Sequence, residues 1–265
     1  MKRLFIIIFI IIFTNIGILK GKVKFGPSYK EISVTPGEKK DGFIYFENTG
    51  NNKIALLCFV NNFKSSKENR RIDWKKWLKL EFNPTNIVIP PKSKKILKYK
   101  VIAPHNLKGE VSAKISFLKV MNKRGTGINT EMSVAVYLIS RKNSYIGGEI
   151  RDFNVSYLSN NIFMVSFELK NKGNIHLRPS GKIFIYTDKK RKRLITGIKI
   201  PKSYPLFENK KVRYEKKFKL INKGKNRYIF EINLSLGYNN IYNIKKEYFV
   251  ELNNNKILKI KKKNE

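Results

Sequence analysis

The chain contains few of the residues that metal sites and disulfide-stabilised folds require. Among its 265 residues there are one cysteine, Cys58, and two histidines, His105 and His176. One cysteine cannot form an intramolecular disulfide or a thiolate-rich zinc or iron–sulfur site, and two histidines leave little material for a metal centre. The sequence therefore predicts a fold held by burial and hydrogen bonds, with no metal and no cofactor.

Motifs of catalytic centres are also missing. His105 follows Pro104 in an expected loop, His176 follows a Gly-Asn turn, and neither lies in a nucleophile motif. The sequence has no phosphate-binding Gly-Lys-Ser/Thr loop and no His-Glu-x-x-His pair. We therefore expect a protein that is not an enzyme. A distant pair of facing carboxylates, as glycosidases use, is the alternative that the sequence leaves open.

Acidic residues are scarce as well. There are 19 Asp and Glu against 56 Lys and Arg, which gives a formal net charge of +37. Such an excess is typical of proteins that bind polyanions such as nucleic acids. However, Asn and Ile are abundant together with Lys, as A/T-rich codons produce, and the charges are spread along the chain. We interpret most of this charge as solvated surface and do not expect a nucleic-acid partner.

A long apolar run follows the charged N-terminus. Lys2 and Arg3 precede Leu4–Leu19, which consists mostly of Ile, Phe and Leu. This is the pattern of a secretory signal peptide, so residues 1–21 are predicted to be a signal and the mature protein to be periplasmic or extracellular. No Ala-x-Ala cleavage site follows, and an uncleaved N-terminal membrane anchor is therefore the alternative.

The rest of the chain has the pattern of strands and turns. Short runs of alternating or β-branched apolar residues are separated by clusters of Gly, Asn, Pro and Asp. In the first half the expected strands are Gly42–Glu47, Lys53–Val60, Thr85–Ile89, Lys94–Ile102, Val111–Lys119 and Met132–Ser140. In the second half they are Arg151–Tyr157, Phe163–Lys170, Gly181–Thr187, Arg193–Ile200, Arg213–Leu220, Tyr228–Leu236 and Glu247–Leu252.

This strand pattern predicts an all-β fold class. About seven short strands in each half is the number of an immunoglobulin-like sandwich. We therefore expect two consecutive immunoglobulin-like β-sandwich domains, at residues 22–142 and 145–252, followed by a basic polar tail at 253–265. The one helical candidate is Ile72–Leu78, where Trp74 and Trp77 would share a face and pack over the end of a sandwich.

Part of the first half resembles a known family. The stretch Ile87–Val101, followed by Ala103-Pro104, Gly109 and Ala113–Phe117, resembles the N-terminal domain of PapD-like periplasmic pilus chaperones. The resemblance covers Val23–Ser140, which is also similar to the sandwich of the WxL-interacting surface proteins of Gram-positive bacteria. It implies an exported, non-catalytic protein that binds a protein partner of the cell envelope, such as a surface or pilus subunit, by strand addition.

The resemblance also implies where such a partner binds. Pilus chaperones hold a subunit's terminal carboxylate with one cation in the first strand and one in the last strand of the first domain, and they lend alternate apolar residues of that last strand. Lys30 stands near the first cationic position. The last strand has no Lys or Arg, so the second position is missing. Its alternate apolar residues are Met132, Val134, Val136 and Leu138. An ordinary core strand is the other interpretation.

A second functional class stays open at this point. Basic sandwiches also attract anionic wall polymers by long-range electrostatics. That would make the protein a cell-surface or wall-binding adhesion or structural module. A contact with the membrane is expected only through an uncleaved signal anchor.

Overall fold

The computed structural model describes residues 23–64, 69, 72–119, 131–187, 193–238 and 242–263. These residues form β-strands with a single short 3-10 turn, η3 (Trp74–Lys76), as their only helical element with assigned bounds. The predicted signal at residues 1–21 lies outside the described residues. Within them, no helix is long and apolar enough to cross a membrane.

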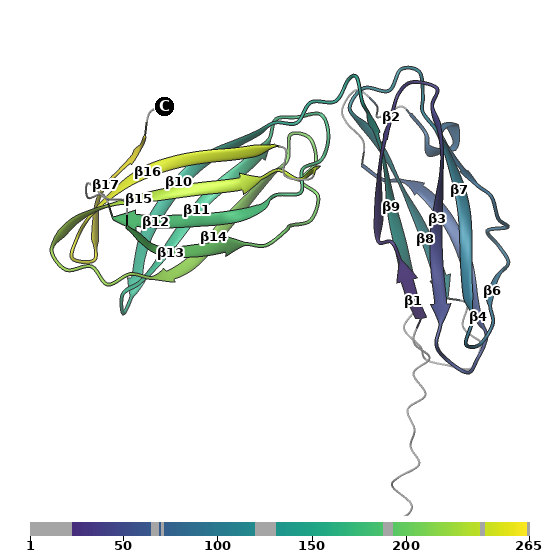
Figure 1. Ribbon diagram of the computed structural model, residues 1–265, viewed down its shortest axis with the longest axis horizontal. Helices are drawn as coiled ribbons and strands as arrows, with labels where there is room; N and C mark the ends of the chain where they lie inside the picture. The colour runs from purple at the N-terminus through teal and green to yellow at the C-terminus, as the bar shows by residue number, and fades with distance from the viewer. Residues whose placement is uncertain are drawn as a thin grey trace, which may run out of the picture.

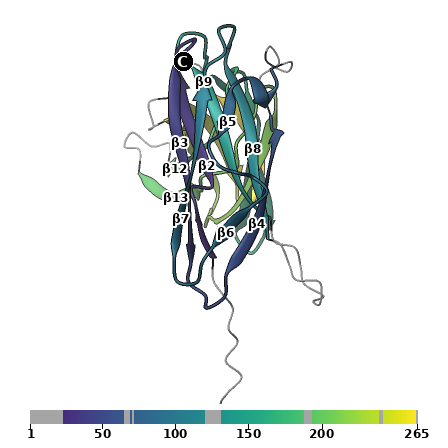
Figure 2. The same cartoon turned by 90° about the vertical axis from the view of Figure 1, so that its right-hand side faces the viewer.

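The strands form two sandwiches whose long axes cross at a steep angle (Figure 1). In the first sandwich, one sheet has the order β1-β3-β7-β5 and the other β2-β9-β8-β4-β6. Figure 2 looks onto this sandwich, with the second behind it. Its strands are β1 (Val23–Gly26), β2 (Tyr29–Val34), β3 (Lys39–Asn48), β4 (Ile54–Asn62), β5 (Leu78–Leu80), β6 (Ile87–Ile89), β7 (Lys94–Ile102), β8 (Glu110–Lys119) and β9 (Glu131–Ser140).

The second sandwich pairs a sheet of order β10-β11-β14 with one of order β13-β12-β15-β16-β17. Its strands are β10 (Gly148–Ser159), β11 (Ile162–Asn171), β12 (Ser180–Thr187), β13 (Leu194–Ile200), β14 (Lys211–Lys219), β15 (Lys225–Ser235), β16 (Asn243–Asn253) and β17 (Lys256–Lys262). The fold class is thus all-β, as the sequence predicts.

Alternation along the strands builds one core in each sandwich. In β3, Ile44 and Phe46 point inward and are fully buried, whereas Phe43 and Tyr45 point outward. The ring of Phe46 meets that of Phe117 from β8 edge to face, with centroids 4.9 Å apart. The second core gathers residues such as Phe167 and Phe230 in the same way.

Two short segments differ from the sequence prediction. Of the expected polar tail at 253–265, the described residues 253–263 are structured, because Asn254 and Asn255 form a turn and Lys256–Lys262 returns as β17, whose Ile257 and Ile260 pack on the core. The expected helix at Ile72–Leu78 is only the turn η3, because the chain enters strand β5 at Leu78. Trp77 is fully buried in the first core, where Trp74 also packs.

The same asparagine arrangement closes a loop in each sandwich. Asn48 and Asn171 are both fully buried at the ends of β3 and β11. Each side-chain oxygen accepts a hydrogen bond from the backbone N–H of a glycine two residues later, Gly50 at 2.9 Å and Gly173 at 2.8 Å. The Asn171 amide also donates to the carbonyl of Ile175, at 2.8 Å. Asn171 therefore fixes the loop that leads to His176.

Candidate functional site

The last strand of the first sandwich is only partly paired on one side. β8 pairs with β9 from Glu131 to Ile139. On the other side, β2 runs parallel to β9 and pairs only from Ala135 to Ser140. The chain upstream of β2 leaves this sheet and pairs as β1 with β3. Within the part of the chain that the structure describes, Glu131–Val134 therefore has an open strand edge.

The direction of the hydrogen bonds along β9 shows which groups this edge presents. The N–H of Ser140 donates toward the β8 side, to Gly109, whereas the N–H groups of Ala135 and Arg141 donate to Ser28 and Val34 on the β2 side. In an antiparallel pair, successive residues alternate between these two directions. The N–H and C=O of Ser133 therefore point away from β8, toward the open side.

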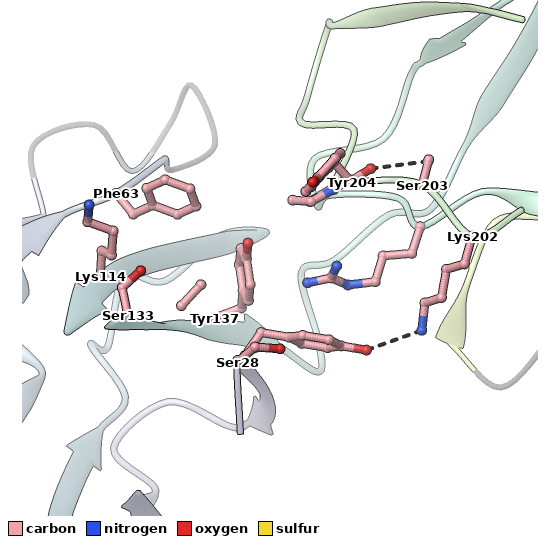
Figure 3. A pocket seen from close by; sticks show the side chains of 12 residues that line it. Ser28, Phe63, Lys114, Ser133, Tyr137, Lys202, Ser203 and Tyr204 are labelled. Atoms are coloured by element: carbon pink, nitrogen blue, oxygen red, sulfur yellow. Dashed lines mark hydrogen bonds between the residues drawn. The ribbon is translucent and has the colours of Figure 1, made fainter. Parts of the chain in front are cut away.

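The open edge lies beside a cleft between the two sandwiches. The cleft has a volume of about 640 Å³. The first sandwich contributes Tyr29, Phe63, Lys114, Ser133 and Tyr137 to its walls, and the second contributes Arg178, Lys202, Ser203, Tyr204 and Pro205. Figure 3 shows Phe63, Lys114, Ser133 and Tyr137 on one side of the cleft and Lys202, Ser203 and Tyr204 on the other. The cleft thus combines a strand edge with aromatic walls and cationic side chains.

Three cations line the cleft, in different states of pairing. Lys114 forms an ion pair with Glu131, at 2.9 Å, on the first sandwich. Arg178 donates from Nε to Glu31 at 2.7 Å. The Nζ of Lys202 donates to the hydroxyl of Tyr29 at 3.1 Å (Figure 3). Lys202 makes no ion pair with a carboxylate among residues 23–64, 69, 72–119, 131–187, 193–238 and 242–263, so it can receive an anionic group.

A buried ionic cluster joins the sandwiches next to the cleft. The imidazole of His176 is fully buried. Its Nδ1 lies 2.6 Å from Oε2 of Glu110, and its Nε2 lies 3.0 Å from Oε1 of Glu31. Glu31 also accepts the bond from Arg178, whose guanidinium stacks on the ring of Tyr29 at 3.7 Å. These contacts fix the second sandwich against β2 and β8 of the first.

The cluster shifts the pKa values of its members. Burial alone would raise the pKa of Glu31, but hydrogen bonds from His176 and Arg178 outweigh it and lower this pKa to about 2. Burial has the opposite effect on His176 and by itself would lower its pKa. The hydrogen bonds of His176 to Glu110 and Glu31 outweigh burial, so this pKa is raised above 6.5. Burial raises the pKa of the Tyr137 hydroxyl to about 12. The hydrogen bonds of His176 to Glu110 and Glu31 thus shift its equilibrium toward the charged form relative to a free imidazole.

The residues proposed from the resemblance are placed differently from the expectation. Val134, Val136 and Leu138 are fully buried in the first core, and Met132 packs against that core. They do not form an exposed apolar row, because these side chains face inward and β2 covers the later part of the strand. The core-strand interpretation is correct for their side chains. The part of the candidate edge that stays open is the main chain of Glu131–Val134.

Lys30 also lies away from the cleft. It is exposed in β2. Because side chains alternate along a strand, it points to the face opposite Tyr29 and Glu31, which contact the second sandwich. The cations in the cleft are Lys114, Arg178 and Lys202 instead. In the sequence, Arg178 and His176 are recognisable only as residues that follow the Gly173-Asn174 turn. That position does not show that their loop contacts the first sandwich.

Comparisons with known proteins find similarity at the level of fold. No protein-family model and no curated protein matches the chain. The class 5 fimbriae chaperone CfaA is similar over 85% of this chain and 98% of its own, with 14% identity and a TM-score of 0.43. The CsuC–CsuE chaperone–subunit complex from Acinetobacter baumannii covers 91% and 97%, at 13% identity and 0.40. The E. coli chaperone DraB covers 82% and 92%, at 8% and 0.37. The resemblance stated from the sequence thus recurs among solved structures as a likeness of fold.

Proposed function

We propose that this protein binds an extended segment of another protein in the cleft between its sandwiches. The bound segment adds a strand to the open edge of β9 at Glu131–Val134. The observation that carries the proposal is this edge itself, because the N–H and C=O of Ser133 face the open side next to the cleft. Strand addition draws affinity from such main-chain groups and specificity from side-chain pockets.

Two other sheet edges carry exposed lysines, which the open edge of β9 lacks. Edge strands are commonly protected from pairing by charged side chains, above all lysine. β14 is an edge strand and exposes Lys211, Lys217 and Lys219, and the edge strand β17 exposes Lys259, Lys261 and Lys262. In β9, the exposed charge at the open edge is Glu131, which Lys114 neutralises.

The side chains around the edge suggest the kind of segment that fits. Phe63, Tyr137 and Phe207 form an aromatic cluster, with Phe63 and Phe207 centroids 5.7 Å apart, so apolar side chains of the ligand have walls to pack against. Lys202 has a donor for an acidic group. An apolar segment with a carboxylate therefore matches the cleft better than a basic segment. The predicted signal at residues 1–21 would place this function in the cell envelope.

The test uses proline at the open edge. Proline has no N–H, and an edge strand tolerates it where that N–H does not pair within the sheet. Ser133→Pro should therefore leave the far-UV spectrum unchanged and abolish binding of short apolar peptides with a free C-terminal carboxylate, measured by fluorescence anisotropy. Ser133→Ala is the matched control and should bind like the parent. Equal binding by Ser133→Pro and parent would refute strand addition at this edge.

A second candidate function, binding of anionic wall polymer, is favoured by the exposed lysine rows of β14 and β17. The two functions differ in their response to salt. Binding driven by scattered charges weakens steeply as ionic strength rises, whereas main-chain pairing does so far less. Binding of a wall polymer that is unaffected by Ser133→Pro and lost at high salt would favour the second function.

A further inference from the structure

His176 reaches out of the second sandwich and lies between two carboxylates of the first. It follows β11 in sequence, whereas Glu31 belongs to β2 and Glu110 begins β8. The two contacts use the two ring nitrogens, at 3.0 Å to Glu31 and 2.6 Å to Glu110. Both His176 and the Glu110 side chain are almost completely buried, with side-chain exposures of 0% and 2%. Water is therefore excluded from the contact with Glu110, whereas Glu31, at 26% exposure, lies closer to the solvent.

The number of protons decides whether both contacts are favourable. A neutral imidazole carries one N–H, and its other nitrogen has a lone pair. With both carboxylates ionised, a neutral ring would therefore set a lone pair against a carboxylate oxygen at one of the two contacts. A protonated ring donates from both nitrogens and makes two charge-assisted hydrogen bonds. The observed distances are those of two bonds.

The other groups around the ring do not supply the missing proton or charge. From β9, the ring of Tyr137 packs against the imidazole with centroids 4.1 Å apart and the ring planes tilted by 33°. From the segment after β15, the hydroxyl of Tyr238 donates to the backbone carbonyl of His176 at 2.6 Å. Arg178 compensates Glu31 only. The described surroundings thus hold two carboxylates against one guanidinium, and an imidazolium balances them.

We propose that this cluster is a proton-dependent latch between the two sandwiches, closed when His176 is an imidazolium and weakened when it loses its proton. The latch goes beyond strand binding and does not rest on it. It has a consequence for the cleft, because Glu31 is shared between His176 and Arg178, and Arg178 lines the cleft wall. When His176 loses its proton, its contact with Glu31 weakens, and this changes how Glu31 holds Arg178 in the cleft wall.

The direction of the pH dependence follows from the bonds that the charged ring makes. The pKa of His176 is raised above its ordinary 6.5 by Glu110 and Glu31, against the opposing effect of burial. A raised pKa in the folded state stabilises the interface fully below that ordinary value, and the stabilisation is lost as the pH rises through the raised value. The latch is therefore closed below pH 6.5 and opens as the pH rises through the raised pKa of His176.

The experiment measures the latch without any ligand. Spin labels are attached at Lys98→Cys and Lys217→Cys, exposed positions of the two sandwiches, in a Cys58→Ala background, and the distance distribution is recorded at about pH 5.5 and about pH 9. We expect a narrow distribution at the lower pH and a broader or shifted one at the higher pH. His176→Gln should give the broad distribution at both, while His105→Gln, which changes the other, exposed histidine, should behave like the parent.

Three results would overturn the latch. They are a parent distribution that is the same at both pH values, a His105→Gln variant that loses the response, and a His176 imidazole that titrates at or below 6.5 by NMR. If His176→Gln does not fold, Glu31→Gln replaces it, and the midpoint of His176 must then fall below that of the parent. Failure of peptide binding by Ser133→Pro or by the parent has no bearing on these distances.

Discussion

The guanidinium of Arg178, in the second sandwich, stacks on the ring of Tyr29 in the first sandwich at 3.7 Å. The same arginine donates to Glu31, two residues further along β2. The arginine side chain thus contacts two residues of β2. The first residue of this strand, Tyr29, pairs with Ala135 and so marks where the open edge of β9 ends. The interface between the sandwiches and the candidate binding cleft therefore share their residues.

Replacement of Arg178 should loosen this interface. Arg178→Ala removes the partner of Glu31 and the cation over Tyr29, and breaking a largely buried pair costs on the order of 3 kcal/mol. We expect a lower midpoint of thermal unfolding and weaker peptide binding. Arg178→Lys should recover only part of either, because an ammonium neither stacks like a guanidinium nor matches its donor geometry. Arg213→Ala, at an exposed pair with Glu215, is the control and should change neither property.

Lysine in the middle of β9 should unfold the first sandwich. Val134 and Val136 are fully buried, and burying an unpaired charge costs several kcal/mol. The double variant Val134→Lys, Val136→Lys is therefore expected to lose cooperative unfolding of the first sandwich, as followed by tryptophan fluorescence. A folded double variant with lost peptide binding would show instead that these side chains form the binding row.

The two buried asparagines should affect different sandwiches. Asn171→Ala leaves the carbonyl of Ile175 without its donor, and an unsatisfied buried group costs about 1–3 kcal/mol. The carbonyl of Leu206 loses the same amide but keeps the N–H of Leu177. Both tryptophans of the chain, Trp74 and Trp77, lie in the first sandwich. In urea, Asn171→Ala should therefore lower the midpoint of the far-UV signal more than that of tryptophan fluorescence.

Asn48→Ala is the matched variant in the first sandwich. It should lower the midpoint of tryptophan fluorescence, because Asn48 holds the loop between β3 and β4 through the carbonyls of Asn52 and Pro90. Identical shifts of both signals in both variants would mean that the sandwiches unfold as one cooperative unit.

Acid should weaken the interface through Glu31. Its pKa is lowered from 4.5 to about 2 in the folded protein, chiefly by hydrogen bonds from His176 and Arg178 that overcome the effect of burial. A lowered pKa contributes stability above the unfolded value, and that stability is lost as the pH falls from about 4.5 toward 2. The unfolding temperature of Glu31→Gln should therefore depend less on pH over this range than that of the parent. An equal dependence in both would assign the acid sensitivity to other carboxylates.

The sequence by itself determined most of the strands, although not β1, β2, β5 or β17. Lys94–Ile102 was predicted with the bounds of β7, because Leu97, Tyr99 and Val101 alternate with lysines and two prolines precede the segment. The turn at Thr35–Glu38 forms where Pro36 and Gly37 are adjacent, with Gly37 at φ 77° and the N–H of Glu38 donating to Thr35. These features depend on residues close together in the chain, where local sterics and hydrogen bonds decide.

Only the tertiary structure decided which strand edge stays open and which residues meet across the cleft. Alternation shows that Val134 and Ser133 face opposite sides of β9, but not which strand pairs beside them. That depends on where the chain passes from β1 in one sheet to β2 in the other. Likewise, His176 and Glu110 are 66 residues apart, and Arg178 and Glu31 are 147 apart. Their contacts lie between two sandwiches that each have their own core, so no local pattern in the sequence encodes them.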